Sequence, residues 1–423
     1  MRWLLICLFC VPLMLKAQLP DEVYHKNIRS VKLFIKGNQA GYPIISLGTL
    51  DQLELHFDDM DGYAKSYSYT FQLCDADWKP NTLLGPFDYI KGFSQQRLSQ
   101  YRVSSIATQE YIHYQASLPE KNCYPSKSGN YLLKVFLNGD TSKLAFTKRL
   151  LVVQQLADVG AQIQQPFSSE YFRTHQKVQL VVNKTKLDVL NPQQQIKTVI
   201  LQNYRWDATM KMVQPTFIKQ NTLEYNAEND ALFPGGKEFR WIDLRSFRFK
   251  SDRIDSNNLN QNPFYIVAKP DGERTTQRYL FFRDMNGFYE TTSTDLINPW
   301  WQGDYAKVKF TFVPTGNQPY PNRRLYIAGE FTGYQYNDST EMVYNAAAGV
   351  YEKELFLKQG YYTYTYVTKD TKTNVPAVDQ TDGNYWETEN DYTVLIYYRS
   401  LSGRHDELVG VTTVNSRLNR SGF

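Results

Sequence analysis

The stretch Tyr67-Ser68-Tyr69-Thr70-Phe71-Gln72-Leu73 decides the fold class of this chain. Its aromatic and aliphatic side chains alternate with polar ones, so an extended backbone places the two kinds on opposite faces. This pattern is typical of a strand in a sheet that buries one face. Similar runs recur in the first third of the chain, with turn residues between them, at residues 31–35, 53–57, 131–137 and 146–153.

The composition extends this prediction to the whole chain. Aromatic residues make up 15% of the 423 residues, with 32 Tyr and 24 Phe, and long helical periodicity is nearly absent. We therefore expect an all-β protein of three consecutive β-sandwich, immunoglobulin-like domains, at residues 19–156, 157–296 and 297–423. Further strands are predicted at residues 178–182, 198–203, 247–250, 265–267, 280–282, 308–312, 325–328, 351–356, 361–367 and 392–398.

The first eighteen residues predict export. Arg2 precedes an apolar run over residues 3–15, and Ala17-Gln18 offers a small-residue cleavage site. The run is too short to span a membrane, which takes about twenty apolar residues, and no later stretch approaches that length. Residues 1–18 are therefore expected to be a secretory signal peptide.

The net charge bears on the possible partners, and the cysteine content bears on a possible disulfide. The formal net charge of +4 becomes +2 without Arg2 and Lys16, so nothing in the overall charge points to nucleic acid or to an anionic membrane surface. Cys7 and Cys10 leave with the signal peptide. The remaining Cys74 and Cys123 could form a disulfide that stabilises the first domain by about 4 kcal/mol, or could be two separate buried thiols.

No motif for catalysis, phosphate binding or a metal is evident in the sequence. There is no nucleophile elbow, no H-E-x-x-H and no phosphate-cradling glycine loop. The histidines are scattered singly, so three of them would have to converge in space to hold a catalytic zinc; they are His25, His56, His113, His175 and His405. We therefore expect a protein without catalytic residues, metal or cofactor, and not an enzyme.

Two acidic clusters have a structural explanation. The run that contains Asp58, Asp59, Asp61 and Gly62 is similar to a calcium loop, but Phe57 and Ser68 occupy positions where carboxylates belong, so a charged β-turn is expected. Asp75 and Asp77 could form an acid/base pair. They follow a predicted strand and precede Trp78 and Pro80, where Asp usually caps a turn through the backbone.

Aromatic residues in the last third of the chain suggest interdomain packing and one resemblance. Trp300 and Trp301 are expected to pack between domains. Residues 325–334 and 360–366 resemble early-set immunoglobulin-like domains of the glycogen-binding type, which stack a pair of tryptophans on sugar rings. Trp386 is the only tryptophan after Trp301, so that pair is not evident. The alternation of Tyr362, Tyr364 and Tyr366 predicts one core face of a strand instead.

A wider resemblance covers almost the whole chain after residue 18. The blocks that carry it are, in order, residues 74–81, 89–93, 101–104, 111–114, 128–131, 235–240, 243–245, 390–394, 397–399 and 403–410. The sequences of these blocks and their order resemble those of the plug protein family of the type IX secretion system of Bacteroidota. One such block is Cys74-Asp75-Ala76-Asp77-Trp78-Lys79-Pro80-Asn81. The chain departs from the family at residues 105–108, where Ser-Ile-Ala-Thr replaces the more usual Phe-Asn-Thr sequence.

The resemblance implies a periplasmic protein at the inner face of the outer membrane. It would dock on the very large outer-membrane β-barrel translocon and close its periplasmic opening by occupying it, as a monomer when released and without a cofactor. Phe331, Tyr334, Tyr336 and Tyr385 are loop aromatics that could anchor this contact, or could be ordinary loop packing within the chain.

Other classes of protein stay open at this stage. The main one is a glycan-binding β-sandwich protein associated with polysaccharide uptake. An outer-membrane barrel commonly ends in an aromatic, as Phe423 does, but residues 416–422 lack the alternation of a lipid-facing strand. A glycosidase would need two facing carboxylates, which the sequence alone does not locate.

Overall fold

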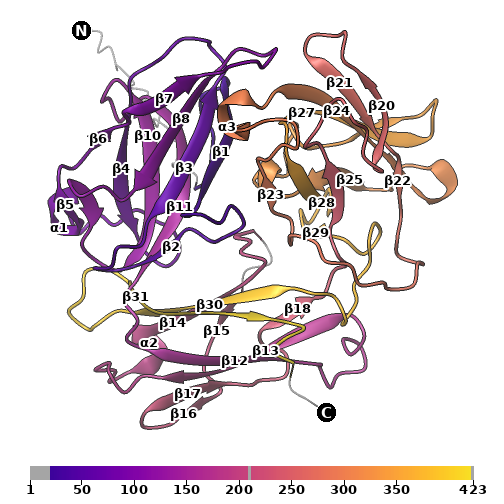
Figure 1. The fold of residues 1–423 in the computed structure, drawn as a ribbon. Helices are drawn as coiled ribbons and strands as arrows, with labels where there is room; N and C mark the ends of the chain where they lie inside the picture. The colour runs from indigo at the N-terminus through magenta and orange to yellow at the C-terminus, as the bar shows by residue number, and fades with distance from the viewer. Residues whose placement is uncertain (1–19, 208–210, 421–423) are drawn as a thin grey trace, which may run out of the picture.

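The computed structural model describes residues 20–207 and 211–420 and consists mostly of β-strands, which confirms the all-β prediction (Figure 1). The expected signal peptide and Phe423 lie outside the described residues. None of the helices in the described part of the chain is long and apolar enough to cross a membrane. The helical segments are α1 (Pro86–Tyr89), α2 (Pro192–Gln195), α3 (Pro299–Gln302), η1 (Thr315–Asn317) and η2 (Glu330–Thr332).

Module one, residues 28–153, is a sandwich of two sheets with strand orders β1-β3-β8-β7 and β2-β11-β10-β4-β6, beside a separate ribbon of β5 and β9. The alternating stretch Tyr67–Leu73 forms most of β4, where Tyr67, Tyr69, Phe71 and Leu73 point into the core between the sheets. Its strands are β1 (Ile28–Ile35), β2 (Ile44–Ser46), β3 (Leu53–Asp59), β4 (Tyr67–Cys74), β5 (Ile90–Gly92), β6 (Gln96–Arg97), β7 (Gln100–Val103), β8 (Ile112–Leu118), β9 (Cys123–Pro125), β10 (Gly129–Leu137) and β11 (Leu144–Val153).

Module two combines residues 158–234 with the last two strands, residues 391–415. One sheet has the order β12-β13-β17-β16, with β18 on β13, and the other has the order β15-β14-β30-β31. Its strands are β12 (Asp158–Gln164), β13 (His175–Asn183), β14 (Ile196–Gln202), β15 (Lys211–Val213), β16 (Phe217–Ile218), β17 (Thr222–Tyr225), β18 (Leu232–Pro234), β30 (Asp391–Tyr398) and β31 (Glu407–Asn415).

Module three, residues 240–377, is inserted between the two parts of module two. One of its sheets has the order β20-β21-β24-β27-β26, with β22 on β24, and in the other β19, β23, β25 and β29 all pair with β28. Its strands are β19 (Arg240–Asp243), β20 (Ile254–Asn258), β21 (Phe264–Ala268), β22 (Asp271–Gly272), β23 (Tyr289–Glu290), β24 (Tyr305–Val313), β25 (Arg323–Ala328), β26 (Val343–Asn345), β27 (Val350–Lys358), β28 (Tyr361–Asp370) and β29 (Pro376–Ala377).

The strand pairing does not follow the expected boundary between residues 296 and 297. Strands β19 to β22 share sheets with β24 and β28, and β30 pairs along β14. The reason is that apolar cores form by long-range pairing, so the chain leaves module two and returns to it. Two expected strands, at residues 247–250 and 280–282, are loops instead.

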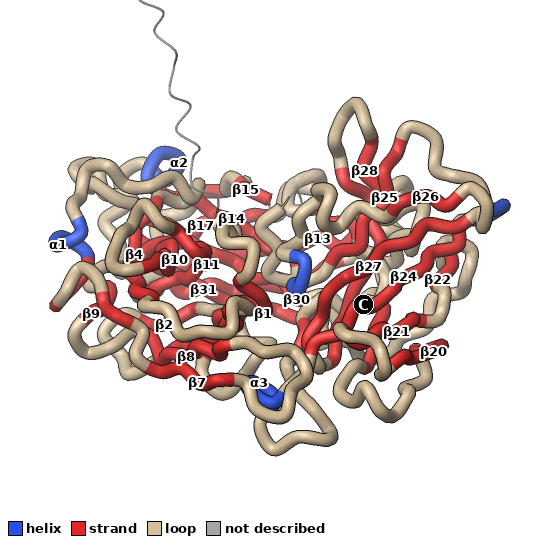
Figure 2. The backbone as a smooth tube through the Cα atoms, turned by 90° about the horizontal axis from the view of Figure 1, so that it is seen from above, coloured by secondary structure: helices blue, strands red, loops and turns tan. Residues whose placement is uncertain are grey.

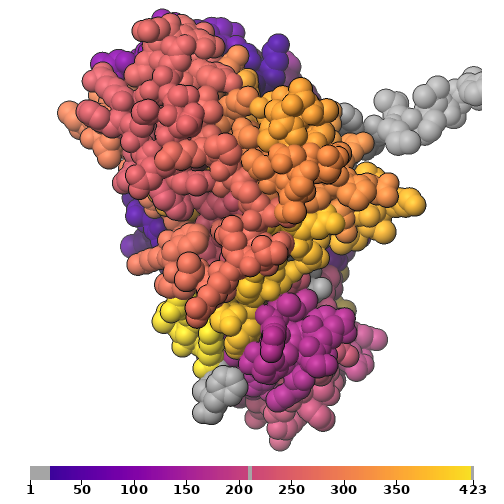
Figure 3. Space-filling view, turned by 90° about the vertical axis from the view of Figure 1, so that its right-hand side faces the viewer, coloured from indigo at the N-terminus to yellow at the C-terminus, as the bar shows by residue number. Residues whose placement is uncertain are grey.

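The three modules form a triangle in which each contacts the other two. Modules one and three lie side by side and module two lies beneath both (Figure 1). Seen from above, modules one and three extend to opposite ends of the molecule (Figure 2). From the side, the yellow C-terminal strands lie between module three and the magenta part of module two (Figure 3).

Candidate functional site

The contact between modules one and two is apolar. Leu132 and Leu151, on the outer face of one sheet of module one, belong to a buried cluster with Val199, Leu201 and Leu395 of module two. Each of these five side chains is fully buried. Burial of such aliphatic surface on both sides contributes the non-directional stabilisation of an ordinary protein core.

The contact between modules one and three is built around a buried ion pair. The carboxylate of Asp58 in β3 accepts hydrogen bonds from His113 Nδ1 at 2.7 Å, from the Tyr305 hydroxyl at 2.6 Å and from Lys358 Nζ at 2.5 Å. Asp58 is 1% exposed and the Lys358 side chain 0%. Lys358 Nζ also donates to the backbone oxygen of Trp300. These bonds join strands of both modules in one network that water does not reach.

The protonation states in this network follow from burial and charge. Burial opposes ionisation of Asp58, but the Lys358 ammonium and the bond from His113 outweigh it and lower the pKa of Asp58. Burial lowers the pKa of His113 to about 4. A neutral His113 that donates from Nδ1 to Asp58 accepts at Nε2 from His56 Nδ1, 3.0 Å away. Burial lowers the pKa of Lys358, but the Asp58 carboxylate opposes this shift, and burial lowers the pKa of His56 as well, so the network holds one carboxylate, one ammonium and two neutral imidazoles.

Aromatic stacking covers the same interface, which confirms the expected interdomain role of Trp300 and Trp301. The Trp300 ring stacks on His56 with a centroid distance of 3.9 Å and an interplanar angle of 10°. The guanidinium of Arg102 lies 4.7 Å from the ring centroid of Trp301. Both tryptophans lie in α3, and both contact module one.

A second buried contact crosses the interface beside the Asp58 network. Lys32 of β1, whose side chain is fully buried, donates to Glu330 of η2 at 2.7 Å, and its ammonium lies 4.2 Å from the ring centroid of Tyr289. Neither buried lysine was expected from the sequence. A signal was present in β3, where His56 and Asp58 alternate with apolar residues, but alternation alone suggests that such a face meets solvent.

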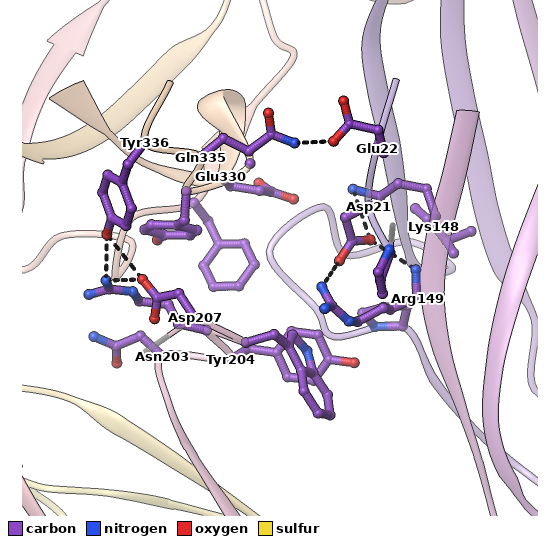
Figure 4. A pocket seen from close by; sticks show the side chains of 18 of the residues that line it. Asp21, Glu22, Lys148, Arg149, Asn203, Tyr204, Asp207, Glu330, Gln335 and Tyr336 are labelled. Atoms are coloured by element: carbon purple, nitrogen blue, oxygen red, sulfur yellow. Dashed lines mark hydrogen bonds and ion pairs between the residues drawn. The ribbon is translucent and has the colours of Figure 1, made fainter. Parts of the chain in front are cut away.

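A cavity of about 540 Å³ lies where the three modules meet (Figure 4). Asp21 and Arg149 line it from module one, Tyr204 and Asp207 from module two, and Tyr336 from module three. Every charged side chain that Figure 4 labels has a partner within the chain. The ion pairs are Asp21 with Arg149 and Lys148, Asp207 with Arg205, and Glu330 with Lys32. Glu22 and Asp207 also accept hydrogen bonds from Gln335 and Tyr336, respectively. Three of these contacts cross between modules: the hydrogen bonds of Gln335 to Glu22 and of Tyr336 to Asp207, and the ion pair of Lys32 with Glu330.

The four aromatic residues proposed as partner anchors all make contacts within the chain. Tyr334 and Tyr336 line the junction cavity, and the Tyr336 hydroxyl donates to Asp207 at 3.0 Å. Phe331 packs against the core of module three. The Tyr385 hydroxyl donates to the backbone oxygens of Thr275 and Gln277, with Lys237 over its ring. Their positions give them an intramolecular packing role, the alternative to a partner contact for these loop aromatics.

The two cysteines are free thiols, the second of the two alternatives left open. Cys74 lies in the apolar contact between modules one and two, whereas Cys123 lies in the core inside module one. The two thiols therefore point into different clusters. Burial raises the pKa of each to about 12, so both stay protonated near neutral pH.

Two predictions about polar residues need correction and one is confirmed. His56 and His113 meet across neighbouring strands, although the histidines were expected to be scattered singly. Asp58 and Asp59 belong to β3 rather than to a charged turn, because β3 continues past Phe57 to pair with β8. Asp75 does cap a turn, since its Oδ1 accepts from the backbone nitrogens of residues 77 and 79.

The tyrosine alternation in β28 is confirmed as a core face. Tyr362, Tyr364 and Tyr366 are buried in module three, and the last two donate to Asp271. Trp386 is 9% exposed and packs in the core of module two, with the Arg420 guanidinium 5.0 Å from its ring centroid. It presents no open face on which a sugar ring could stack.

Comparisons with known proteins agree with part of the expected resemblance. Residues 28–154 match the family model described as "Type 9 secretion system plug protein 1st domain". A crystal structure of a hypothetical protein from Parabacteroides merdae is similar over 95% of this chain and 100% of that chain, with 28% sequence identity and a TM-score of 0.90. No functionally curated protein matches. The expected early-set, glycogen-binding-type likeness of residues 297–423 is not confirmed.

Proposed function

We propose that this chain is a periplasmic plug of the type IX secretion system, which docks on the outer-membrane β-barrel translocon and closes its periplasmic opening. The match of residues 28–154 to the first domain of the plug proteins supports this assignment. That segment is module one, which contacts both other modules. The likeness to the Parabacteroides merdae protein spans all three modules, so the proposal treats them as one functional body.

The observation that carries the proposal is the way in which the three modules are joined. Module one is fixed to module two by an apolar cluster and to module three by the buried Asp58–Lys358 pair. A body that closes a wide opening must keep its shape under collisions, and broad buried contacts on two faces provide that rigidity. Closure by occupancy needs no bond-making step and no cofactor.

Release follows from differential binding. A translocon that carries cargo must bind the plug less tightly than an idle one, since a partner shifts an equilibrium only by its difference in affinity for the two states.

The proposal is tested by purifying the tagged chain from detergent-solubilised outer membranes. We expect a very large barrel protein to be recovered with it, and recovery of the chain alone would contradict the proposal. A second measurement is the permeability of cells that lack the gene. They should admit dyes and antibiotics that the intact outer membrane excludes, and unchanged permeability would count against a plug.

A further inference from the structure

A small appendage forms the end of module one that points away from module three. It consists of α1 and the ribbon of β5 and β9, which is separate from the two main sheets. Figures 1 and 2 both place α1 at this extreme end of the molecule, with β5 beside it in Figure 1 and β9 nearby in Figure 2. Tyr89, Ile90 and Cys123 anchor the appendage in the core of module one. We call the appendage together with its flanking residues, including β6 at the edge of a main sheet, the tip; it comprises residues 79–97 and 120–127.

Four large apolar side chains project from the tip into solvent. Phe87 is 78% exposed, Phe93 64%, Leu83 63% and Tyr124 41%. Their backbones are fixed: Lys91 pairs with Tyr124 across the ribbon, and the Phe93 nitrogen donates to the Asn122 oxygen at 2.6 Å. A well-ordered element that keeps aromatic rings in water at a protruding end indicates a surface that another body covers.

The tip also carries an excess of basic residues. The tip carries five basic residues, Lys79, Lys91, Arg97, Lys121 and Lys127, against two acidic ones, Asp88 and Glu120. Its net charge is +3, whereas the chain without Arg2 and Lys16 carries +2, so the rest of that chain has a net charge of −1. Within the described residues, none of the five basic side chains forms an ion pair, whereas lysines elsewhere, such as Lys65 and Lys177, do.

We propose that the tip docks on an anionic phospholipid surface. Aromatic rings partition into the boundary between headgroups and acyl chains, while lysine stems extend so that their ammonium groups reach the phosphates. Each basic residue near such a surface strengthens binding by about fivefold at physiological ionic strength. A protruding end with unpaired cations fits a lipid leaflet, which is broad and negative.

The inference deepens the proposed function, because a plug at the inner face of the outer membrane would meet the leaflet beside the barrel. The test contains no barrel protein, so a negative result would contradict the lipid contact of the tip and leave the proposed plug function untouched. The measurement is flotation of the purified full chain with vesicles of phosphatidylethanolamine and phosphatidylglycerol, and with vesicles of phosphatidylcholine alone. We expect binding to the anionic vesicles, weakened by raised salt, and little binding to the neutral ones.

Matched variants locate the contact. Phe87→Ser combined with Phe93→Ser should weaken binding by about tenfold or more, and Lys91→Glu with Lys121→Glu by a similar factor. The control is Phe167→Ser with Phe249→Ser, which removes phenylalanines that are 85% and 75% exposed but lie on modules two and three. The control should bind like the unchanged chain.

Tryptophan fluorescence gives a second measurement of lipid contact that does not depend on how much protein is recovered folded. Tryptophan introduced by Phe87→Trp should be quenched by brominated anionic lipid, whereas Phe167→Trp should not. Two outcomes would overturn the proposal: no flotation with anionic vesicles, or equal losses of vesicle binding in the tip and control variants.

Discussion

Module one uses its two outer faces in opposite ways. The face toward module two carries aliphatic side chains such as Leu132 and Leu151, whereas the face toward module three carries Asp58, His113 and His56. Apolar contacts stabilise in proportion to the apolar area that they remove from water, and they tolerate many relative arrangements of the two surfaces. A buried ion pair contributes little net stability but strongly penalises any arrangement that separates the charges. One interface therefore supplies stability, and the other specifies how module three is placed against module one.

The largest effect is expected from Asp58→Asn. The substitution leaves the fully buried ammonium of Lys358 without its anion, and breaking a buried pair in this way costs about 3–5 kcal/mol. The free energy of unfolding from urea denaturation at pH 7 measures the loss. Asp252→Asn, which neutralises an exposed carboxylate in module three, is the matched control and should change little.

A double-mutant cycle sharpens this test. Lys358→Met combined with Asp58→Asn removes both charges, so the double variant should be more stable than the sum of the two single losses predicts. Additive losses would show that the two charges do not interact and would remove the distinction between the two interfaces.

Leu201→Ala should give the next largest effect, about 3 kcal/mol, since it opens a cavity in the apolar contact between modules one and two. Unlike the ionic variants, it should respond to pH no differently from the unchanged chain. Urea denaturation at pH 7 and pH 5 checks both statements. A pH-dependent loss in Leu201→Ala would mean that the apolar contact depends on the ionic one.

Acid should weaken the ionic interface first. The pKa of His113, about 4 in the folded chain, lies below the value of about 6.5 in unfolded chains, so the unfolded state binds more protons between these values. Stability therefore falls as the pH drops below about 6.5, by about 2 kcal/mol at pH 5 for this group. Asp58, whose pKa is lowered, adds a loss only below its unfolded value of about 3.9.

His113→Gln isolates that contribution. Burial also lowers the pKa of His405 to about 4, so the variant should keep part of the pH dependence, and the difference between the two profiles belongs to His113. The measurement is the urea midpoint from pH 7 to pH 5. Profiles that are parallel over this range would show that His113 titrates normally in the folded chain.

The sequence predicted what each strand presents to its own sandwich, but not what covers the other face. In β4 the alternation of tyrosines with polar residues identified the core correctly. In β3 the predicted strand ended at Phe57 and Asp58 was expected in a turn, whereas the strand continues to Asp59 and carries His56 and Asp58 on the face opposite Leu55 and Phe57, which local pattern assigns to solvent. That face meets Lys358, 300 residues further along the chain. Local periodicity contains no information about such a partner, nor about the return of β30 to β14.

The smallest effect is expected for an ion pair that water reaches. Lys219 and Glu224 form a salt bridge in module two, and the Lys219 side chain is 62% exposed. Solvent screening and the entropy of holding two long side chains leave such a pair worth less than about 0.5 kcal/mol. Lys219→Ala should therefore shift the urea midpoint by less than the error of a single measurement. A loss comparable to that of Asp58→Asn would mean that charge alone, rather than its burial between two modules, sets the cost of breaking a pair in this protein.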